Sequence, residues 1–203
     1  EVLALRMGVD AKASKFPVKE WMQFYNQCRG DLVHVFNSRN AGMFGERFQS
    51  MEPGAEQDRI SFAWNLFVEY ERYKQNRNLL DYDDLLLLPV LGLSRQAPEN
   101  QALLESLRNI YRFITVDEVQ DTNKVQYALI RLIGTHGNVV LVGDDDQGIY
   151  SWRGARIDNL YQFRDENRAA VVTLTRNYRS TRAIVSAAGK CIAHYRKRVE
   201  KKP

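Results

Sequence analysis

Residues 113–122, Phe-Ile-Thr-Val-Asp-Glu-Val-Gln-Asp-Thr, decide the fold of this chain. Phe113–Val116 is a short run of apolar and β-branched residues, which is typical of a buried strand. Two carboxylates, Asp117 and Glu118, follow it directly. In a parallel sheet, residues just beyond the carboxyl end of a strand line the ligand crevice. The stretch therefore predicts a strand of an α/β sheet with an acidic pair at its functional edge.

An acidic pair in that position suits a phosphate-bound Mg²⁺ ion. Mg²⁺ takes oxygen ligands and is usually held by one or two carboxylates together with substrate phosphates. One acid can hold the ion while its neighbour orients or deprotonates the attacking water. The alternative is that Asp117 and Glu118 only cap the following helix. The strand and its two acids leave both interpretations open.

Strands and helices alternate with short connections on the C-terminal side of this stretch, which predicts a parallel sheet with crossover helices. The predicted elements are a helix over 122–133, a buried strand over 139–142, a helix over 157–163, a buried strand over 171–174 and a helix from Ser180 or Thr181 to about residue 195. The fold class that follows is α/β. In that sheet we expect Phe113–Val116 to be internal, so the loss of a neighbouring strand would expose an apolar edge.

The spacing of apolar residues on the N-terminal side is typical of helices. The composition shifts near residues 78–111, which marks a boundary between a helical part and an α/β part. Apolar residues recur at helical spacing in three stretches, which begin near Pro17, Asp58 and Pro98, and residues 37–55 are predicted as mostly loop. Asp81–Asp84 precedes the apolar run Leu85–Leu88. Carboxylates in that position usually cap a helix, so a cap is favoured there over a metal site.

Composition narrows the class of protein. The 203 residues are 44% hydrophobic and 27% charged, which is ordinary for a globular protein and excludes a disordered tail, a collagen or a coiled-coil rod. No apolar run approaches the roughly 20 residues of a membrane span. Two isolated cysteines and the lack of a secretory signal predict a cytoplasmic protein. The chain does not begin with Met, so we expect a piece of a longer protein.

Charge is distributed unevenly along the chain. Residues 171–203 hold nine Lys or Arg and one acid, a net charge of +8, whereas residues 1–170 carry −4. The body is therefore not a basic DNA-coating surface. The basic C-terminal stretch could contact phosphates, or it could be the solvated end of a helix.

Two further stretches carry polar and aromatic residues after predicted strands. Gln147 has an amide that can bond both a phosphate oxygen and a water. Tyr150 and Trp152 are two residues apart, so in extended backbone they point the same way and can stack on single-stranded bases. Tyr178 could stack on a purine, and Arg179 could reach a transferring phosphoryl group. Core aromatics, a surface arginine and a helix cap are the alternatives.

Taken together and in this order, three motifs resemble motifs II, III and IV of the UvrD/Rep/PcrA-like superfamily 1 DNA helicases. They are V-D-E-V-Q-D-T-N at 116–123, G-D-D-D-Q-G-I-Y-S-W-R-G-A at 143–155 and L-T-R-N-Y-R-S-T at 174–181. The resemblance is specific from about residue 81 to 188. L-D-Y-D-D-L-L at 80–86 also resembles the segment in which the family's chain returns from its helical insertion to the motor core.

The resemblance implies a domain organisation. Residues 1–78 correspond to a helical 1B-like subdomain, residues 79–170 to the C-terminal part of the RecA-like domain 1A, a parallel-sheet P-loop NTPase domain, and residues 171–203 to the start of RecA-like domain 2A.

The resemblance also implies a nucleotide site for ATP and Mg²⁺. Asp117 matches the acid that coordinates Mg²⁺, and Glu118 the acid that activates water. Gln147 matches the glutamine that contacts the γ-phosphate and couples nucleotide state to the grip on DNA. Tyr178 matches the residue that stacks on adenine, and Arg179 the arginine that reaches the γ-phosphate.

DNA is the partner that the resemblance implies. Tyr150 and Trp152 match aromatics that stack on single-stranded bases, and Arg153 belongs to the same DNA-binding motif without one assigned contact. Single-stranded and duplex DNA are thus the expected partners, with DNA-repair proteins as further candidates and no membrane. The location that the resemblance implies is the bacterial cytosol or nucleoid.

Departures from the family pattern bear on activity. Gly148 stands where the family usually has Ser, and Val119 replaces a common aromatic. No G-x-x-x-x-G-K-[ST] loop occurs in the chain, so it lacks a backbone cradle for phosphates. The parent is expected to be an ATP-dependent 3′-to-5′ DNA helicase, and this chain by itself to be inactive. The alternatives are a helicase–nuclease recombination subunit and a non-catalytic module that binds single-stranded DNA or protein.

Overall fold

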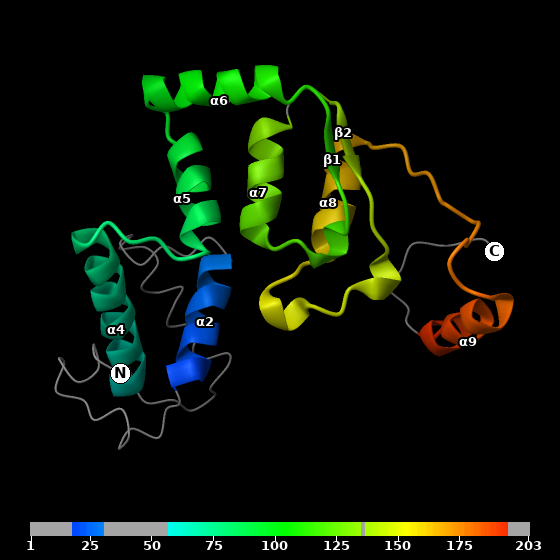
Figure 1. Cartoon of the computed structure of the whole chain (residues 1–203), viewed down its shortest axis with the longest axis horizontal. Coiled ribbons are helices and arrows are strands. Elements are labelled where there is room, and N and C mark those ends of the chain that lie inside the picture. Colours follow the sequence, from blue (N-terminus) through cyan, green and yellow to red (C-terminus); the bar gives the residue numbers. More distant parts are fainter. Residues whose placement is uncertain (1–17, 31–56, 135–136, 195–203) are drawn as a thin grey trace. The chain divides into compact units, whose positions relative to one another are not determined.

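The computed structural model describes residues 18–30, 57–134 and 137–194 (Figure 1). The chain divides into two compact units, one of residues 1–111 with 123–133 and one of residues 112–122 with 134–203. The loop predicted over 37–55 lies outside the described residues. The division into parts at 1–78, 79–170 and 171–203 stays a prediction.

Helices account for the regular structure of the described part of the first unit. They are α2 (Val18–Gly30), α4 (Gln57–Asn76), α5 (Asp84–Leu93), α6 (Pro98–Ile110) and α7 (Lys124–Ile133). These helices confirm the ones that periodicity predicts. Pro98 opens α6 at a position where its missing N–H costs nothing.

Two apolar cores hold this unit together. The first joins α2 to α4 and contains Tyr25 and Phe67, whose rings stack with centroids 4.5 Å apart. The second joins α5 to α7 through Leu87, Val90 and Val125. Helix α6 runs across one end of α5 and α7 (Figure 1), and it buries Leu104 while Leu103 and Ile110 stay exposed.

The second unit contains a parallel pair of short strands, β1 (Ile114–Val116) and β2 (Val139–Leu141). Ile114 pairs with Val139, and Val116 pairs with Leu141. Both strands confirm predicted ones, but they are half-buried where buried strands were expected, with Val140 56% exposed. β1 has β2 as its single neighbour within the described sheet, so its other edge is unpaired.

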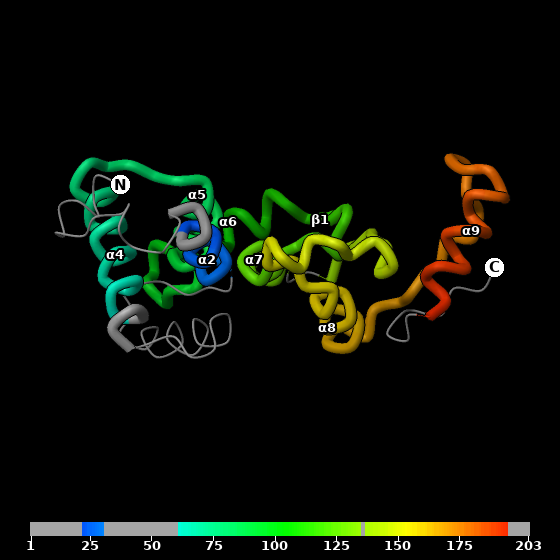
Figure 2. Tube along the Cα trace, turned by 90° about the horizontal axis from the view of Figure 1, so that it is seen from below, coloured from blue at the N-terminus to red at the C-terminus, as the bar shows by residue number. Residues whose placement is uncertain are grey.

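The rest of this unit is short turns and helices. Three 3₁₀ turns, η1 (Val119–Asp121), η2 (Asp145–Gln147) and η3 (Ser151–Arg153), precede α8 (Asp158–Asn167) and α9 (Arg182–Ile192). The chain between α8 and α9 can be followed in Figure 2. No helix in the described part of the chain is both long and apolar enough to cross a membrane.

The strand predicted over Val171–Leu174 is wrong. These residues have no regular structure, and the side chains of Val172 and Leu174 are 82% and 84% exposed. A strand is stable only when its N–H and C=O groups pair with a neighbour, and no described strand pairs with this segment. β-Branched composition alone therefore did not make a strand here.

Candidate active site

Asp117 and Glu118 leave β1 at its carboxyl end, as predicted. Both side chains are exposed. Glu118 has a φ of 50°, in the left-handed region that non-glycine residues rarely adopt. Its backbone N–H donates to Oδ1 of Asp117 at 2.9 Å. The sharp turn at Glu118 thus fixes one oxygen of Asp117 and ends the strand.

The turn that follows lies against the end of β2. The backbone N–H of Val119 donates to the carbonyl of Val142 at 3.0 Å, and the N–H of Val142 donates to the carbonyl of Val116 at 2.7 Å. Val119 is completely buried. These bonds bring the acidic turn beside residues 143–147, so the second motif lies next to the first at one edge of the sheet.

Gln120 links the two motifs, and sequence reasoning assigned it no role. Its buried amide donates from Nε2 to Oε2 of Glu118 at 2.6 Å. Its Oε1 accepts the backbone N–H of Asp144 at 3.1 Å. The available signal in the sequence was a polar residue in the turn directly after a strand, where the chain packs against the sheet. The site therefore contains a polar bridge beneath the exposed acids.

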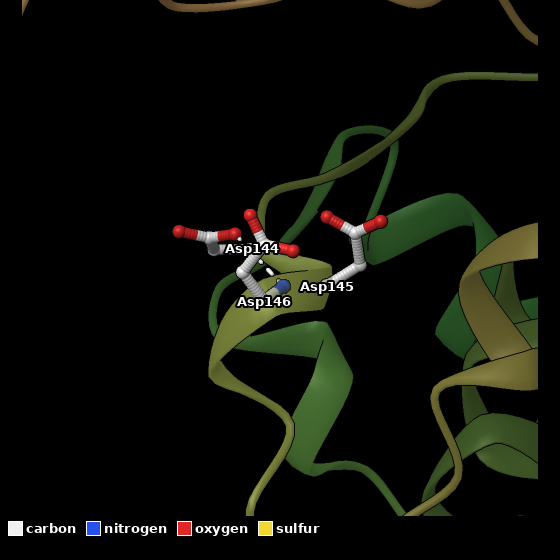
Figure 3. A group of neighbouring side chains, drawn as sticks. All are labelled: Asp144, Asp145 and Asp146. Carbon is white, nitrogen blue, oxygen red and sulfur yellow. Dashed lines mark hydrogen bonds between the residues drawn. The ribbon is translucent and has the colours of Figure 1, made fainter. Parts of the chain in front are cut away.

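Three consecutive carboxylates, Asp144, Asp145 and Asp146, begin the second motif (Figure 3). One oxygen of each lies within 4.8 Å of the others, so the group has the spacing to hold a metal ion. Asp144 accepts the N–H of Asp146 at 3.0 Å, the dashed line in Figure 3, and Asp145 accepts the hydroxyl of Tyr161 at 3.0 Å. These bonds give the carboxylates a role in shaping the loop.

Gln147 lies in the same loop as these acids. It is exposed, and its Nε2 donates to Oδ2 of Asp144 at 2.8 Å. Asp144 therefore accepts hydrogen bonds at both carboxylate oxygens, one from the backbone and one from Gln147. The structure brings Asp117, Glu118 and Gln147 to one edge of the two-stranded sheet.

The aromatic pair Tyr150 and Trp152 is arranged around an arginine. Residues Ser151–Arg153 form a 3₁₀ turn, so the expectation of extended backbone is wrong there. The two rings are nevertheless neighbours, with centroids 6.2 Å apart. The guanidinium of Arg153 lies 5.3 Å from the Tyr150 ring and 4.7 Å from the Trp152 ring. Trp152 is 55% exposed, which favours a contact surface over a core role.

Tyr178 and Arg179 lie in the exposed stretch before α9. The Asn177 side chain accepts the backbone N–H groups of Arg179 and Ser180 at 2.9 Å and 2.8 Å, and the guanidinium of Arg176 lies 5.0 Å from the Tyr178 ring. The contacts described for Tyr178 and Arg179 stay within residues 176–180. None of them joins these two residues to Glu118.

Comparison with known proteins adds the family. The model of the UvrD/REP helicase N-terminal domain matches residues 8–168. The chain therefore belongs to the UvrD/REP helicase family. The ATP-dependent DNA helicase Rep of Salmonella typhimurium strain LT2 is 45% identical over 141 residues, and that of Escherichia coli K12 is 44% identical. The ATP-dependent DNA helicase PcrA of Staphylococcus aureus strain COL is 41% identical over 138 residues.

These matches cover 68% of this chain for the Rep helicases and 67% for PcrA. The chain spans about a fifth of the length of these curated relatives, 20% of each Rep and 18% of PcrA. Family membership confirms the resemblance to the UvrD/Rep/PcrA-like helicases, and the match to the family model ends at residue 168, before the motif at 174–181.

The UvrD/REP family chain also contains a buried ion cluster, in its first unit, that the sequence did not reveal. Arg29 and Lys74 lie on the apolar faces of α2 and α4, with 2% and 3% of their surfaces exposed. Lys74 contacts Asp81 and Asp84 at 2.8 Å each, and Arg29 contacts Asp81 at 2.9 Å and also Asp84. The available signal in the sequence was the presence of a charged residue, Arg29 or Lys74, at a helical position whose spacing places it on the apolar face.

This cluster explains the acidic segment before α5. Asp84 accepts the backbone N–H of Asp81 at 2.8 Å, and Asp81 accepts that of Asp84 at 2.9 Å. Asp81 therefore satisfies the first N–H of α5, whereas the N-cap residue Asp83 makes no side-chain capping bond. Burial raises the pKa of Asp84, but hydrogen bonds from Lys74, the Asp81 N–H and Arg29 outweigh it and lower the pKa to about 2. Burial raises the pKa of Glu71, which faces the same two cations.

Proposed function

We propose that the protein containing this chain is an ATP-dependent DNA helicase that couples hydrolysis of ATP to 3′-to-5′ movement along single-stranded DNA and to separation of duplexes. The observation that carries the proposal is the juxtaposition of Asp117, Glu118 and Gln147 at one sheet edge, in a chain of the UvrD/REP family. The relatives named ATP-dependent DNA helicase support the substrate and the energy source.

Hydrolysis of ATP needs a water molecule that attacks the γ-phosphorus, and a group that orients this water and takes its proton. Glu118 is proposed for that role, because its carboxylate is exposed and is held by the amide of Gln120. Gln147 is proposed to contact the γ-phosphate, and Arg179 to stabilise the charge that develops on it. Tyr178 is proposed to stack on the adenine.

Mg²⁺ fits the donor set at this edge. Asp117 offers an exposed carboxylate with one oxygen fixed by the Glu118 N–H, and oxygen is the ligand that Mg²⁺ takes. Asp117 would hold the ion, whose charge when bound neutralises phosphate oxygens. Because no G-x-x-x-x-G-K-[ST] loop occurs in these 203 residues, the activity is proposed for the whole protein and not for this chain alone.

DNA binding is proposed for the surface formed by Tyr150, Trp152 and Arg153. The exposed indole of Trp152 offers a face on which a base can stack, and Arg153 beside it offers a positive charge for the phosphate backbone. Both interactions are independent of base sequence.

The test is strand separation by the full-length protein on duplexes that carry a 3′ or a 5′ single-stranded tail. We expect ATP-dependent separation of the 3′-tailed duplex and little separation of the 5′-tailed one. Equal separation of both would contradict the proposed direction. No separation of either, with intact ATP and DNA binding, would contradict the helicase activity.

A further inference from the structure

We infer that Gln120 is a positioning residue for ATP hydrolysis, which holds the Glu118 carboxylate and joins it to the loop that carries Gln147. The inference rests on the proposed function, in which Glu118 orients the attacking water and Gln147 contacts the γ-phosphate. Gln120 itself is 2% exposed, so it does not reach a ligand and acts only through its neighbours.

Both ends of the Gln120 amide are used. Nε2 donates to Oε2 of Glu118 at 2.6 Å, and Oε1 accepts the N–H of Asp144 at 3.1 Å. One neighbour is an acceptor and the other a donor, so the amide has one orientation that satisfies both. An apolar side chain of the same size would satisfy neither, and a carboxylate would satisfy only Asp144.

The position of the amide is fixed by close packing against the backbone. A Cβ on Gly143 would lie 2.5 Å from Oε1 of Gln120 and 2.8 Å from Cγ1 of Val119. Real Cβ atoms do not approach other atoms so closely, so the amide occupies space that opens only because residue 143 is glycine. The chain after β2 and the Gln120 side chain are therefore fitted to each other.

The polar bridge continues to Gln147. Asp144, whose N–H donates to Gln120, accepts the Gln147 amide at 2.8 Å through its side chain. Glu118 and Gln147 are thus joined through Gln120 and Asp144 by three hydrogen bonds. A shift of the Gln147 loop when its ligand changes would reach the Glu118 carboxylate by this route.

Positioning matters here because the Glu118 side chain is exposed and is otherwise free to rotate. Misplacing a catalytic group by about 1 Å can cost on the order of 100-fold in rate. Loss of the Gln120 bond is therefore expected to lower kcat and to leave nucleotide affinity nearly unchanged, because Gln120 does not touch the nucleotide.

The test uses the full-length protein and Gln120→Met, which keeps the volume of the side chain and removes both hydrogen bonds. Gln126→Met is the matched control, because Gln126 also bonds a backbone N–H, that of Asn123 at 2.9 Å, and lies outside the bridge. DNA-stimulated kcat, KM for ATP and the affinity for AMP-PNP are measured for each variant, alone and combined with Glu118→Gln.

We expect Gln120→Met to lower kcat about 10- to 100-fold with less than about a 3-fold change in AMP-PNP affinity. In the Glu118→Gln background the same change is expected to alter kcat less than about 3-fold, because the group that Gln120 positions is already lost. Gln126→Met is expected to keep kcat within about 2-fold. A merely structural role would instead give Gln120→Met the same loss in both backgrounds, and that result would overturn the inference.

Gln120→Glu covers the case in which the methionine variant fails to fold, because it keeps the size of the side chain and the oxygen that accepts the Asp144 N–H. It is expected to lower kcat as strongly, and an unchanged kcat would overturn the inference. If Glu118→Gln itself keeps normal turnover, the proposed function fails together with the inference. If Glu118→Gln is inactive while both Gln120 variants turn over normally, the inference alone fails.

Discussion

Glu118 is one of two non-glycine residues with a positive φ in the described part of the second unit, and the other, Arg168, follows the end of α8. A non-glycine residue with a φ of 50° costs on the order of 1–3 kcal/mol, and such residues cluster at functional sites. Here the surrounding bonds hold the strained turn, since Val119 is tied to Val142 and the Glu118 carboxylate to Gln120. In this turn the Glu118 side chain is exposed while its neighbour Val119 is buried.

Gly143→Ala is expected to destabilise the second unit by about 1–3 kcal/mol, because its Cβ would overlap Gln120 and the turn at Val119. The measurement is the midpoint of urea unfolding. Gly92→Ala is the control: nothing lies within 4 Å of a Cβ there, and alanine in the interior of α5 is expected to add about 0.5–1 kcal/mol. Equal midpoints for the two variants would contradict the close packing at Gly143.

At the scale of elements, the ion cluster holds α2 and α4 to the segment that begins α5. Arg29 comes from α2, Lys74 from α4, and Asp84 is the first residue of α5. Removing one partner of a buried ion pair leaves the remaining charge without compensation, which typically costs about 3–5 kcal/mol. The cluster therefore favours the one arrangement of these helices in which every buried charge has its partner, in addition to the stability that the apolar contacts provide.

Asp84→Asn is expected to lower the free energy of unfolding by about 3–5 kcal/mol at pH 7. Because the folded-state pKa of Asp84 is about 2 and the ordinary value is 3.8, the ionised group stabilises the fold above pH 3.8. That contribution is lost as the pH falls to 2. The difference in free energy of unfolding between the unsubstituted chain and Asp84→Asn should therefore shrink between pH 3.8 and pH 2, as measured by urea unfolding at each pH.

Asp165→Asn is the control for this prediction. Asp165 pairs with Arg164 at 2.7 Å, but both side chains are exposed, so little change in stability is expected. A loss as large as that of Asp84→Asn would contradict the importance of burial. A difference for Asp84→Asn that stays constant between pH 3.8 and pH 2 would contradict the lowered pKa.

Periodicity and turn signals were enough to predict the helices and the strand pair, because these depend on local spacing of apolar residues. They failed at Val171–Leu174, since a strand depends on a partner that the local sequence does not specify. The positions of Asp117, Glu118 and Gln147 could be predicted because these residues follow strands. The bridge through Gln120 could not be predicted, because it depends on a hydrogen bond between Gln120 and Asp144, which are 24 residues apart in the sequence.

At the scale of the whole chain, the positive charge and the exposed aromatic residues proposed to bind DNA lie in different parts of the sequence. Residues 1–170 carry a net charge of −4, so the DNA binding proposed for this part would come from local features such as Trp152 and Arg153 rather than from a basic surface. Residues 171–203, at +8, could add a salt-dependent contribution from phosphate contacts. The two contributions respond differently to salt.

Trp152→Ala is expected to weaken binding of single-stranded DNA by about 1–3 kcal/mol, because a stacking face is lost. The slope of affinity against salt concentration should stay the same, because no phosphate contact is removed. Fluorescence anisotropy with a labelled oligonucleotide measures both. Tyr82→Ala, an aromatic 90% exposed in the first unit, is the control and should bind DNA normally. Unchanged DNA affinity with a destabilised fold would instead make Trp152 a structural residue.

The role of Glu118 in hydrolysis is tested by measuring ATP turnover of the full-length protein carrying Glu118→Gln, with Mg²⁺ and with and without single-stranded DNA. Glu99→Gln, an exposed carboxylate in the first turn of α6, is the matched control. We expect Glu118→Gln to bind ATP and DNA normally while its DNA-stimulated turnover falls by orders of magnitude, and we expect Glu99→Gln to turn over normally. Near-normal turnover by Glu118→Gln would contradict the role of this sheet edge in hydrolysis.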